Sequence, residues 1–179
     1  YTTLFRSASP IHMLRPEIQE VKRLIDKGTI GKVSFARCSS SHGGPEYFQY
    51  RDADPTWFHQ PGAGPLLDLG VHGLHQVTGL LGPARRVFCL SGISERVRIA
   101  RSGAFDGKAI QTSTDDNIHL NLDFGDATFA YIDSTYCVKN QKGPSLEIFG
   151  SQGTITFTRS SRGVGMELYL DDRERSVRG

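Results

Sequence analysis

Three side chains that can transfer protons lie close together in one stretch of the sequence. Asp68, His72 and His75 follow one another at intervals of four and three residues, a spacing that places side chains on one face of an α-helix. A carboxylate beside an imidazole stabilises the protonated ring, and imidazole is the side chain that most often transfers protons near neutral pH. The spacing indicates general acid–base chemistry, although the same residues would equally suit a solvated polar face of a helix.

Other chemistries fit the sequence less well. One carboxylate and two imidazoles can hold zinc or iron, but the common helical zinc signature sets two histidines at i and i+4 with a glutamate between them, and that spacing is absent. No G-x-S-x-G turn offers a serine nucleophile, and neither a G-x-G-x-x-G run nor a Walker motif offers a nucleotide site. The sequence therefore favours proton transfer without a metal and gives this chain no nucleotide site.

The helix that carries these side chains has to lie within residues 64–81. Its apolar residues recur at helical intervals and form a stripe apart from the polar face, and Gly82-Pro83 ends it. The members of this stripe are Leu67, Val71, Leu74 and Leu81. Four glycines leave room for a ligand or another backbone to approach closely: Gly62, Gly64, Gly70 and Gly73.

The rest of the chain predicts one earlier helix and several strands. Pro16 and Glu17 suit the first turn of a helix, and Gly28 follows its end. Apolar and polar residues alternate strictly over residues 117–124, and Gly125-Asp126 turns the chain into the next strand. We expect strands at residues 32–38, 86–90, 117–124, 127–136, 146–149, 154–158 and 166–170. This order predicts an α+β fold, an open and mostly antiparallel β-sheet with helices packed on one face.

Two segments lack any periodicity. Residues 39–63 contain several prolines and glycines, and a structureless stretch of this length inside a compact domain is usually functional. Residues 95–114 are polar and contain glycine, and we expect them to form a mobile excursion. Four further histidines carry no motif and are expected at solvated loop or strand positions: His12, His42, His59 and His119.

The composition restricts the partners. The 179 residues include 21 lysines and arginines, scattered along the chain, against 19 aspartates and glutamates, so neither nucleic acid nor an anionic membrane is an expected partner, and a small molecule is. No apolar run approaches the roughly 18 residues of a membrane span, and the N-terminus does not read as a signal peptide. The three cysteines are widely spaced, which favours reduced thiols in a cytoplasmic protein.

The first seven residues, YTTLFRS, resemble the translation of a DNA-sequencing adapter. We exclude them from the fold prediction. Residues 8–179 are expected to form one domain that is truncated at both ends.

Four segments occur in an order that a known family shares: LIDKGTIGKV (residues 24–33), residues 64–72, NIHLNLDFGDATFAYIDSTY (residues 117–136) and LEIFGSQGTITF (residues 146–157). Together they resemble the C-terminal domain of the Gfo/Idh/MocA family, which includes glucose-fructose oxidoreductase and inositol dehydrogenase. The resemblance spans residues 11–157. It implies an N-terminal Rossmann domain, upstream of Ser7, that binds NAD or NADP and supplies a catalytic lysine in a Glu-Lys-Pro motif.

The resemblance also implies roles for single residues. His72 matches the motif histidine, the base that removes a hydroxyl proton, and Asp68 matches the aspartate that orients the substrate and the imidazole. His75 occupies a position that is usually aspartate, which bears on the choice of substrate. Trp57 is similar to an aromatic residue near the active site, with a plain core tryptophan as the alternative, and Arg15 falls near a family arginine that binds substrate.

The resemblance implies an NAD(P)-dependent oxidoreductase that acts on a hydroxyl group of a sugar, a polyol or a related compound. It also implies a homo-oligomer formed through one face of the sheet. The alternative is a stand-alone, non-catalytic scaffold that uses the same sheet for dimerisation.

Overall fold

A computed structural model describes residues 11–48, 53–160 and 163–171 of the chain. The adapter-like residues 1–7 and residues 172–179 lie outside this description. The two α-helices are α1 (Pro16–Asp26) and α2 (Val71–Leu81). The strands are β1 (Val33–Ser39), β2 (Arg86–Gly92), β3 (Val97–Ile99), β4 (Ala109–Gln111), β5 (Asn117–Gly125), β6 (Thr128–Thr135), β7 (Leu146–Gly150), β8 (Gly153–Ser160) and β9 (Gly163–Leu170).

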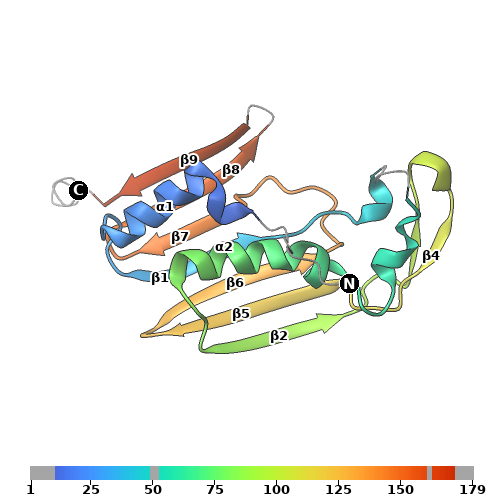
Figure 1. Ribbon diagram of the computed structural model, residues 1–179, viewed down its shortest axis with the longest axis horizontal. Coiled ribbons are helices and arrows are strands. Elements are labelled where there is room, and N and C mark those ends of the chain that lie inside the picture. The colour runs from blue at the N-terminus through green and yellow to red at the C-terminus, as the bar shows by residue number, and fades with distance from the viewer. Residues whose placement is uncertain (1–10, 49–52, 161–162, 172–179) are drawn as a thin grey trace, which may run out of the picture.

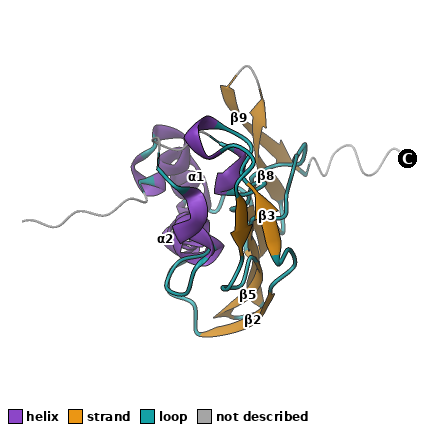
Figure 2. Ribbon diagram, turned by 90° about the vertical axis from the view of Figure 1, so that its right-hand side faces the viewer, coloured by secondary structure: helices purple, strands orange, loops and turns teal. Residues whose placement is uncertain are grey.

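The strands form one large sheet and one small sheet. The large sheet has the strand order β2-β5-β6-β1-β7-β8-β9, and β3 pairs with β4 apart from it (Figure 1). Only the pair of β1 and β6 in the large sheet is parallel, and the other neighbours are antiparallel. Seen along its edge, the sheet carries α1 and α2 on the same side (Figure 2). The predicted α+β fold, an open and mostly antiparallel sheet with helices on one face, is therefore confirmed.

Local sequence explains the strands well. Along β5 the apolar residues Ile118, Leu120 and Leu122 are buried, and the polar residues between them are more exposed. The hairpin to β6 turns at Asp126 and Ala127, whose φ angles of 51° and 55° belong to the left-handed region. Two residues of positive φ form the hairpin turn that matches the twist of the adjoining strands.

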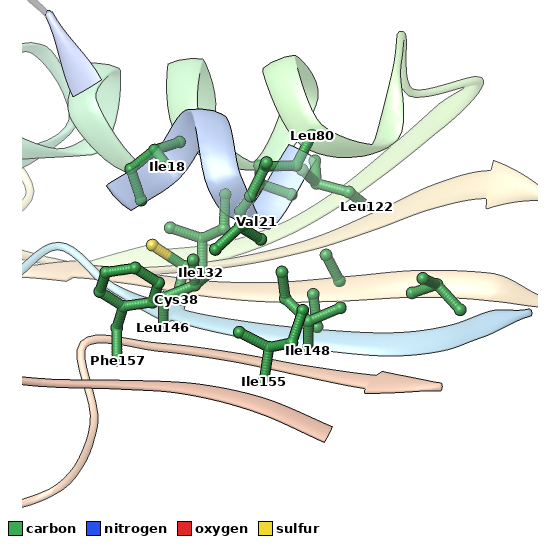
Figure 3. Packing of buried hydrophobic residues seen from close by; sticks show 14 of the residues in the cluster. Ile18, Val21, Cys38, Leu80, Leu122, Ile132, Leu146, Ile148, Ile155 and Phe157 are labelled. Atoms are coloured by element: carbon green, nitrogen blue, oxygen red, sulfur yellow. The ribbon is translucent and has the colours of Figure 1, made fainter. Parts of the chain in front are cut away.

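The core lies between the helices and the sheet. Ile18, Val21 and Leu24 project from α1 at helical spacing onto the sheet. Figure 3 shows Ile18 and Val21 above the buried residues of the central strands, among which are Ile132 of β6 and Ile148 of β7. One face of the large sheet is thus used to bury apolar surface.

The predicted apolar stripe of residues 67–81 is buried only in part: Leu74 and Leu81 are partly buried and pack against the core. Leu67 is 58% exposed, whereas Gly73, Val77 and Leu80 are buried against the sheet. A β-carbon on Gly73 would lie 3.1 Å from both Cγ2 of Ile132 and Cβ of Ser40. The glycines do permit a close approach, and what approaches Gly73 is the sheet.

The two irregular segments contain more structure than their sequences predict. Residues 95–114, expected to be a mobile excursion, contain the β3–β4 pair, in which Ile110 and Arg98 are buried. Residues 39–63 contain two short 3₁₀ helices, Pro45–Tyr47 and Pro55–His59. Within the described ranges, no helix is both long and apolar enough to cross a membrane.

Candidate functional site

A pocket of about 420 Å³ opens between the start of α1, the end of β1 and the start of α2. Its volume falls in the range of small-molecule sites, which is about 300–1,000 Å³. The polar side chains around it include His12, Arg15, Ser39, Ser41, His42 and His72. The structure therefore brings together two of the predicted site residues, His72 and Arg15, which are far apart in the sequence.

His72 lies in the wall of this pocket. Its ring contacts that of His12 edge to face, with centroids 5.2 Å apart and an interplanar angle of 61°. The Nδ1 atom of His72 is buried and has no hydrogen-bond partner among the described residues. Among the described residues, His72 makes no ion pair and no helix-capping contact, so neither kind of contact gives this imidazole a structural role.

Asp68 does not sit beside His72 in the way the helical spacing predicts. Leu66–Gly70 form a π-helical turn, and the N–H of Val71 donates to the carbonyl of Leu66, five residues earlier. Such a turn changes which side chains stack along the helix, because residues five apart rather than four apart are then joined. Within the described residues, no hydrogen bond connects Asp68 to His72; the Oδ2 of Asp68 accepts one from the Tyr136 hydroxyl at 3.0 Å.

Tyr136 is held on both sides by histidine rings. His42 stacks on it with centroids 5.5 Å apart and an angle of 14°, and His59 meets it edge to face at 5.4 Å. The side chain is fully buried. Burial first, and then the nearby charge of Asp68, raise the pKa of Tyr136, so its hydroxyl remains a proton donor to Asp68.

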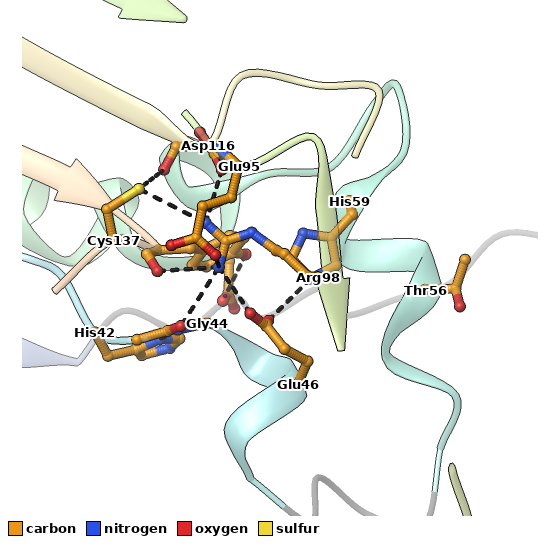
Figure 4. Close-up of polar contacts among 12 residues, drawn as sticks. His42, Gly44, Glu46, Thr56, His59, Glu95, Arg98, Asp116 and Cys137 are labelled. Carbon is orange, nitrogen blue, oxygen red and sulfur yellow. Dashed lines mark hydrogen bonds and ion pairs between the residues drawn. The ribbon is translucent and has the colours of Figure 1, made fainter. Parts of the chain in front are cut away.

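A buried ionic cluster supports this part of the site. Arg98 of β3, only 2% exposed, binds Glu46 and Asp116 with nitrogen–oxygen distances of 2.7 Å each. It also donates to the carbonyl of Tyr136 at 3.1 Å, and Glu46 in turn lies 3.1 Å from Nε2 of His59. Figure 4 shows Arg98 at the centre of these contacts, between the loop of Glu46 and the start of β5.

The charges in this cluster compensate one another. Burial opposes the charge of Arg98, but hydrogen bonds to Asp116 and Glu46 outweigh burial and raise the pKa of the guanidinium. Burial also opposes the charge of Glu46, and its bonds to His59 and Arg98 nevertheless keep the pKa of this carboxyl below its usual value. Arg98 therefore joins Glu46 to Asp116, which precedes β5, and to Tyr136, which follows β6.

The other two predicted site residues lie outside the pocket wall. His75, one turn beyond His72, is partly buried, and its Nδ1 has no hydrogen-bond partner among the described residues. Trp57 is 55% exposed and stacks on Phe58 with centroids 3.7 Å apart, so it is not a core tryptophan. Of the three polar residues Asp68, His72 and His75, only His72 lines the pocket.

Sequence reasoning missed several residues of the site. His12 and His42 line the pocket, and His59 is completely buried, although all three were expected at solvated positions. Arg98 stands between two apolar residues in a segment expected to be mobile. Its strand-like alternation, Val97-Arg98-Ile99, was the available signal, but alternation with an arginine normally predicts an outward charge. The described residues contain no cluster of three or more metal-ligating side chains.

Comparisons with known proteins agree with this fold. The family model described as the GFO/IDH/MocA C-terminal domain matches residues 18–156. No curated protein matches the chain in sequence.

Several solved structures share the fold at low sequence identity. An NAD-binding oxidoreductase from Klebsiella pneumoniae has a TM-score of 0.69 at 22% identity, over 93% of this chain and 43% of its own. The aldose-aldose oxidoreductase from Caulobacter crescentus, solved with glycerol, has a TM-score of 0.63 at 20% identity, over 89% and 43%. The transcriptional regulator Gal80p from Kluyveromyces lactis has a TM-score of 0.67 at 13% identity, over 87% and 44%. The chain spans less than half the length of each of these proteins.

Proposed function

Because the chain belongs to the GFO/IDH/MocA family and carries its C-terminal domain, we propose that it is the substrate-binding part of an oxidoreductase. The reaction is transfer of hydride between NAD or NADP and a hydroxyl group of a sugar, a polyol or a related compound. The chain contributes the pocket and the proton transfer, with His72 as the base.

The observation that carries this proposal is the meeting of His72 and Arg15 in one pocket. The pocket wall adds the hydroxyl groups of Ser39 and Ser41 and the ring of His42. The hydroxyls of Ser39 and Ser41 already donate to Asp133 and can offer only lone pairs to a ligand, whereas imidazole rings donate and accept hydrogen bonds, and this combination suits a ligand that carries several hydroxyls. A base has to lie within hydrogen-bond reach of the proton that it removes, and His72 is the imidazole whose position matches the family motif.

In this proposal Asp68 does not contact the reacting atoms. Its carboxylate is held by Tyr136 behind the ring of His42, so we assign it to positioning the pocket wall. His75 and Trp57 remain proposals for substrate binding, since each would have to reach the substrate from outside the wall described for the pocket.

The dinucleotide itself does not fit the residues present. Helix α1, whose start borders the pocket, begins with Pro16 directly after Arg15 and has no glycine-rich turn before it. A pyrophosphate needs such a turn and the free N–H groups of a helix N-terminus. We therefore assign NAD or NADP to a part of the protein beyond this chain, and we expect calorimetry to detect no micromolar binding of either to the chain alone.

The test is an assay of the complete enzyme, with the preceding segment of its gene included. Oxidation of sugars and polyols is followed as NADH or NADPH formation. His72→Gln keeps a hydrogen-bonding side chain of similar size but cannot carry the proton, so turnover should fall by about 10²–10⁴-fold. Lys27→Gln, at the exposed end of α1, serves as the control. Unchanged turnover in His72→Gln would place the base elsewhere.

We further propose a homo-oligomer that forms through the face of the sheet opposite the helices. Phe88 and Leu90 of β2 and Phe129 of β6, two strands separated by β5, are 60%, 62% and 48% exposed on this face. Contiguous exposed apolar side chains usually mark an interface. The matched test is light scattering on the complete protein and on Phe129→Glu. A monomer in both cases would refute the proposal.

A non-catalytic scaffold remains the second candidate, because a transcriptional regulator shares this fold. It predicts dimers without turnover on any sugar or polyol. We assign the protein to the cytoplasm, and this assignment is supported by three cysteines that form no disulfide in the described part of the chain.

A further inference from the structure

His42 occupies the pocket with one ring nitrogen already engaged. It follows β1 directly, and its Nδ1 accepts a hydrogen bond from the backbone N–H of Gly44 at 3.0 Å. A backbone N–H can only donate, so Nδ1 has to offer its lone pair. In the neutral ring the single proton is then on Nε2, the nitrogen at the far side of the ring.

The turn that makes this bond depends on a glycine. Gly44 has a φ of 111°, and a β-carbon there would lie 2.2 Å from a carboxylate oxygen of Glu46. Only glycine tolerates both the positive φ and the lack of space. The tautomer of His42 is thus determined by the backbone and by the same Glu46 that binds Arg98.

The plane of the His42 ring is also restrained. Its face stacks on Tyr136, and Phe48 meets it edge to face with centroids 5.2 Å apart and an angle of 78°. Two aromatic neighbours and one hydrogen bond leave the ring little freedom to rotate. A donor whose direction is fixed before the ligand arrives loses little conformational entropy on binding.

The ring is held in its neutral form near pH 7. Burial lowers the pKa of His42 below its usual value, and Arg98 acts in the same direction, while the charges of Asp68 and Glu46 oppose this shift. The remaining titratable or charged groups of the pocket wall are His12, Arg15, Glu17, Cys38 and His72. His42 and His72 therefore differ: the former has a restrained tautomer, and the latter has a free Nδ1.

We propose that His42 is a substrate-binding residue whose Nε2–H donates a hydrogen bond to an oxygen of the hydroxyl-bearing ligand, while His72 moves the proton. This inference rests on the function proposed for the pocket. A neutral donor can hold the oxygen on which charge develops without taking up the proton itself. Specificity follows, because a ligand that lacks an oxygen at this place leaves the N–H unpaired.

The first experiment uses the chain as it stands and does not depend on activity. Nitrogen-15 spectra of the histidine rings should show the Nε2–H tautomer for His42 from neutral to alkaline pH. The ring should take up a second proton only at a pH below the pKa of histidine in the unfolded chain. His119, which bonds to Tyr131 on the opposite face, is the internal reference. Addition of glycerol as a polyol probe should shift the His42 Nε2–H signal and leave that of His119 unchanged. An Nδ1–H tautomer, or no response to glycerol, would overturn the proposal.

The second experiment uses the complete enzyme. His42→Phe keeps a ring that can stack on Tyr136 but removes the donor, and His42→Gln retains a donating amide. A lost hydrogen bond of ordinary strength should raise KM about tenfold in His42→Phe, less in His42→Gln, with kcat changed little in either. Circular dichroism establishes that both variants are folded. An unchanged KM in a folded His42→Phe enzyme would refute the donor role, whereas inactivity of the unaltered enzyme would refute only the proposed function.

Discussion

The hydroxyl of Tyr136 donates a hydrogen bond to Oδ2 of Asp68 across 3.0 Å, and it joins the end of β6 to the π-helical turn before α2. The ring behind this hydroxyl is fixed by His42 and His59, and its backbone carbonyl is held by Arg98. The carboxylate of Asp68 is therefore positioned by a series of contacts that leads into the buried ionic cluster. A substitution at any residue in this series of contacts should therefore affect the pocket.

Removing the hydroxyl in Tyr136→Phe should destabilise the chain. A hydrogen bond to a charged group contributes about 1.5–3 kcal/mol, and Asp68 would lose its donor. Urea unfolding should show a loss of this size. Tyr169→Phe is the control, since Tyr169 is 67% exposed and should change the free energy of unfolding hardly at all. Equal effects in the two variants would mean that the Tyr136 hydroxyl contributes nothing specific.

Replacing the buried arginine should be more costly. Arg98→Met leaves Glu46 and Asp116 buried without their cation, and breaking a buried pair in this way costs about 3–5 kcal/mol. Hydrogen exchange should then become fast in β3 and β4. Arg86→Met removes an ion pair whose arginine side chain is 83% exposed, and should cost at most about 1 kcal/mol. A stable Arg98→Met protein with protected β3 and β4 would contradict the role of the cluster.

The close packing of α2 on the sheet predicts that Gly73 cannot be enlarged. Gly73→Val would force side-chain atoms into Ile132 and Ser40, and overpacking of this kind costs about 1–3 kcal/mol. Because Gly73 also lines the pocket, glycerol binding should weaken as well. Gly92→Val, at a position with open space around it, should be close to neutral in thermal unfolding. A Gly73→Val chain as stable as the Gly92→Val chain would disprove this packing.

The cysteines should differ in reactivity. Burial first, and then the charge of Asp133, raise the pKa of Cys38 to about 12, whereas Cys89 is exposed. A folded-state pKa above the unfolded value means that Cys38 contributes stability below the unfolded pKa, and this contribution is lost as the pH rises through about 12. With iodoacetamide at pH 8, mass spectrometry should find Cys89 alkylated and Cys38 intact until the protein is unfolded. Rapid modification of Cys38 in the folded chain would show that it is accessible.

Short-range patterns predicted most of the elements. Alternation over residues 117–124 predicted β5, and the glycine that follows predicted a hairpin. Pro16 and Glu17 predicted the start of α1, and Gly28 predicted that it ends before residue 28. These predictions hold because backbone hydrogen bonding and side-chain period are decided within a few residues along the chain. The family resemblance rests on the same local runs and is confirmed by the match over residues 18–156.

What the sequence by itself determined is the fold class, the two α-helices and the strands of the large sheet, together with the candidate base His72. Only the tertiary structure decided that α2 packs on the sheet at Gly73, because this close contact involves Ile132, which lies far along the chain. It likewise decided the partner of Asp68, since Tyr136 lies 68 positions further along the chain. Arg98 and His42 reveal their roles only when residues far apart in sequence surround them, because burial and pairing of a charge depend on neighbours in space.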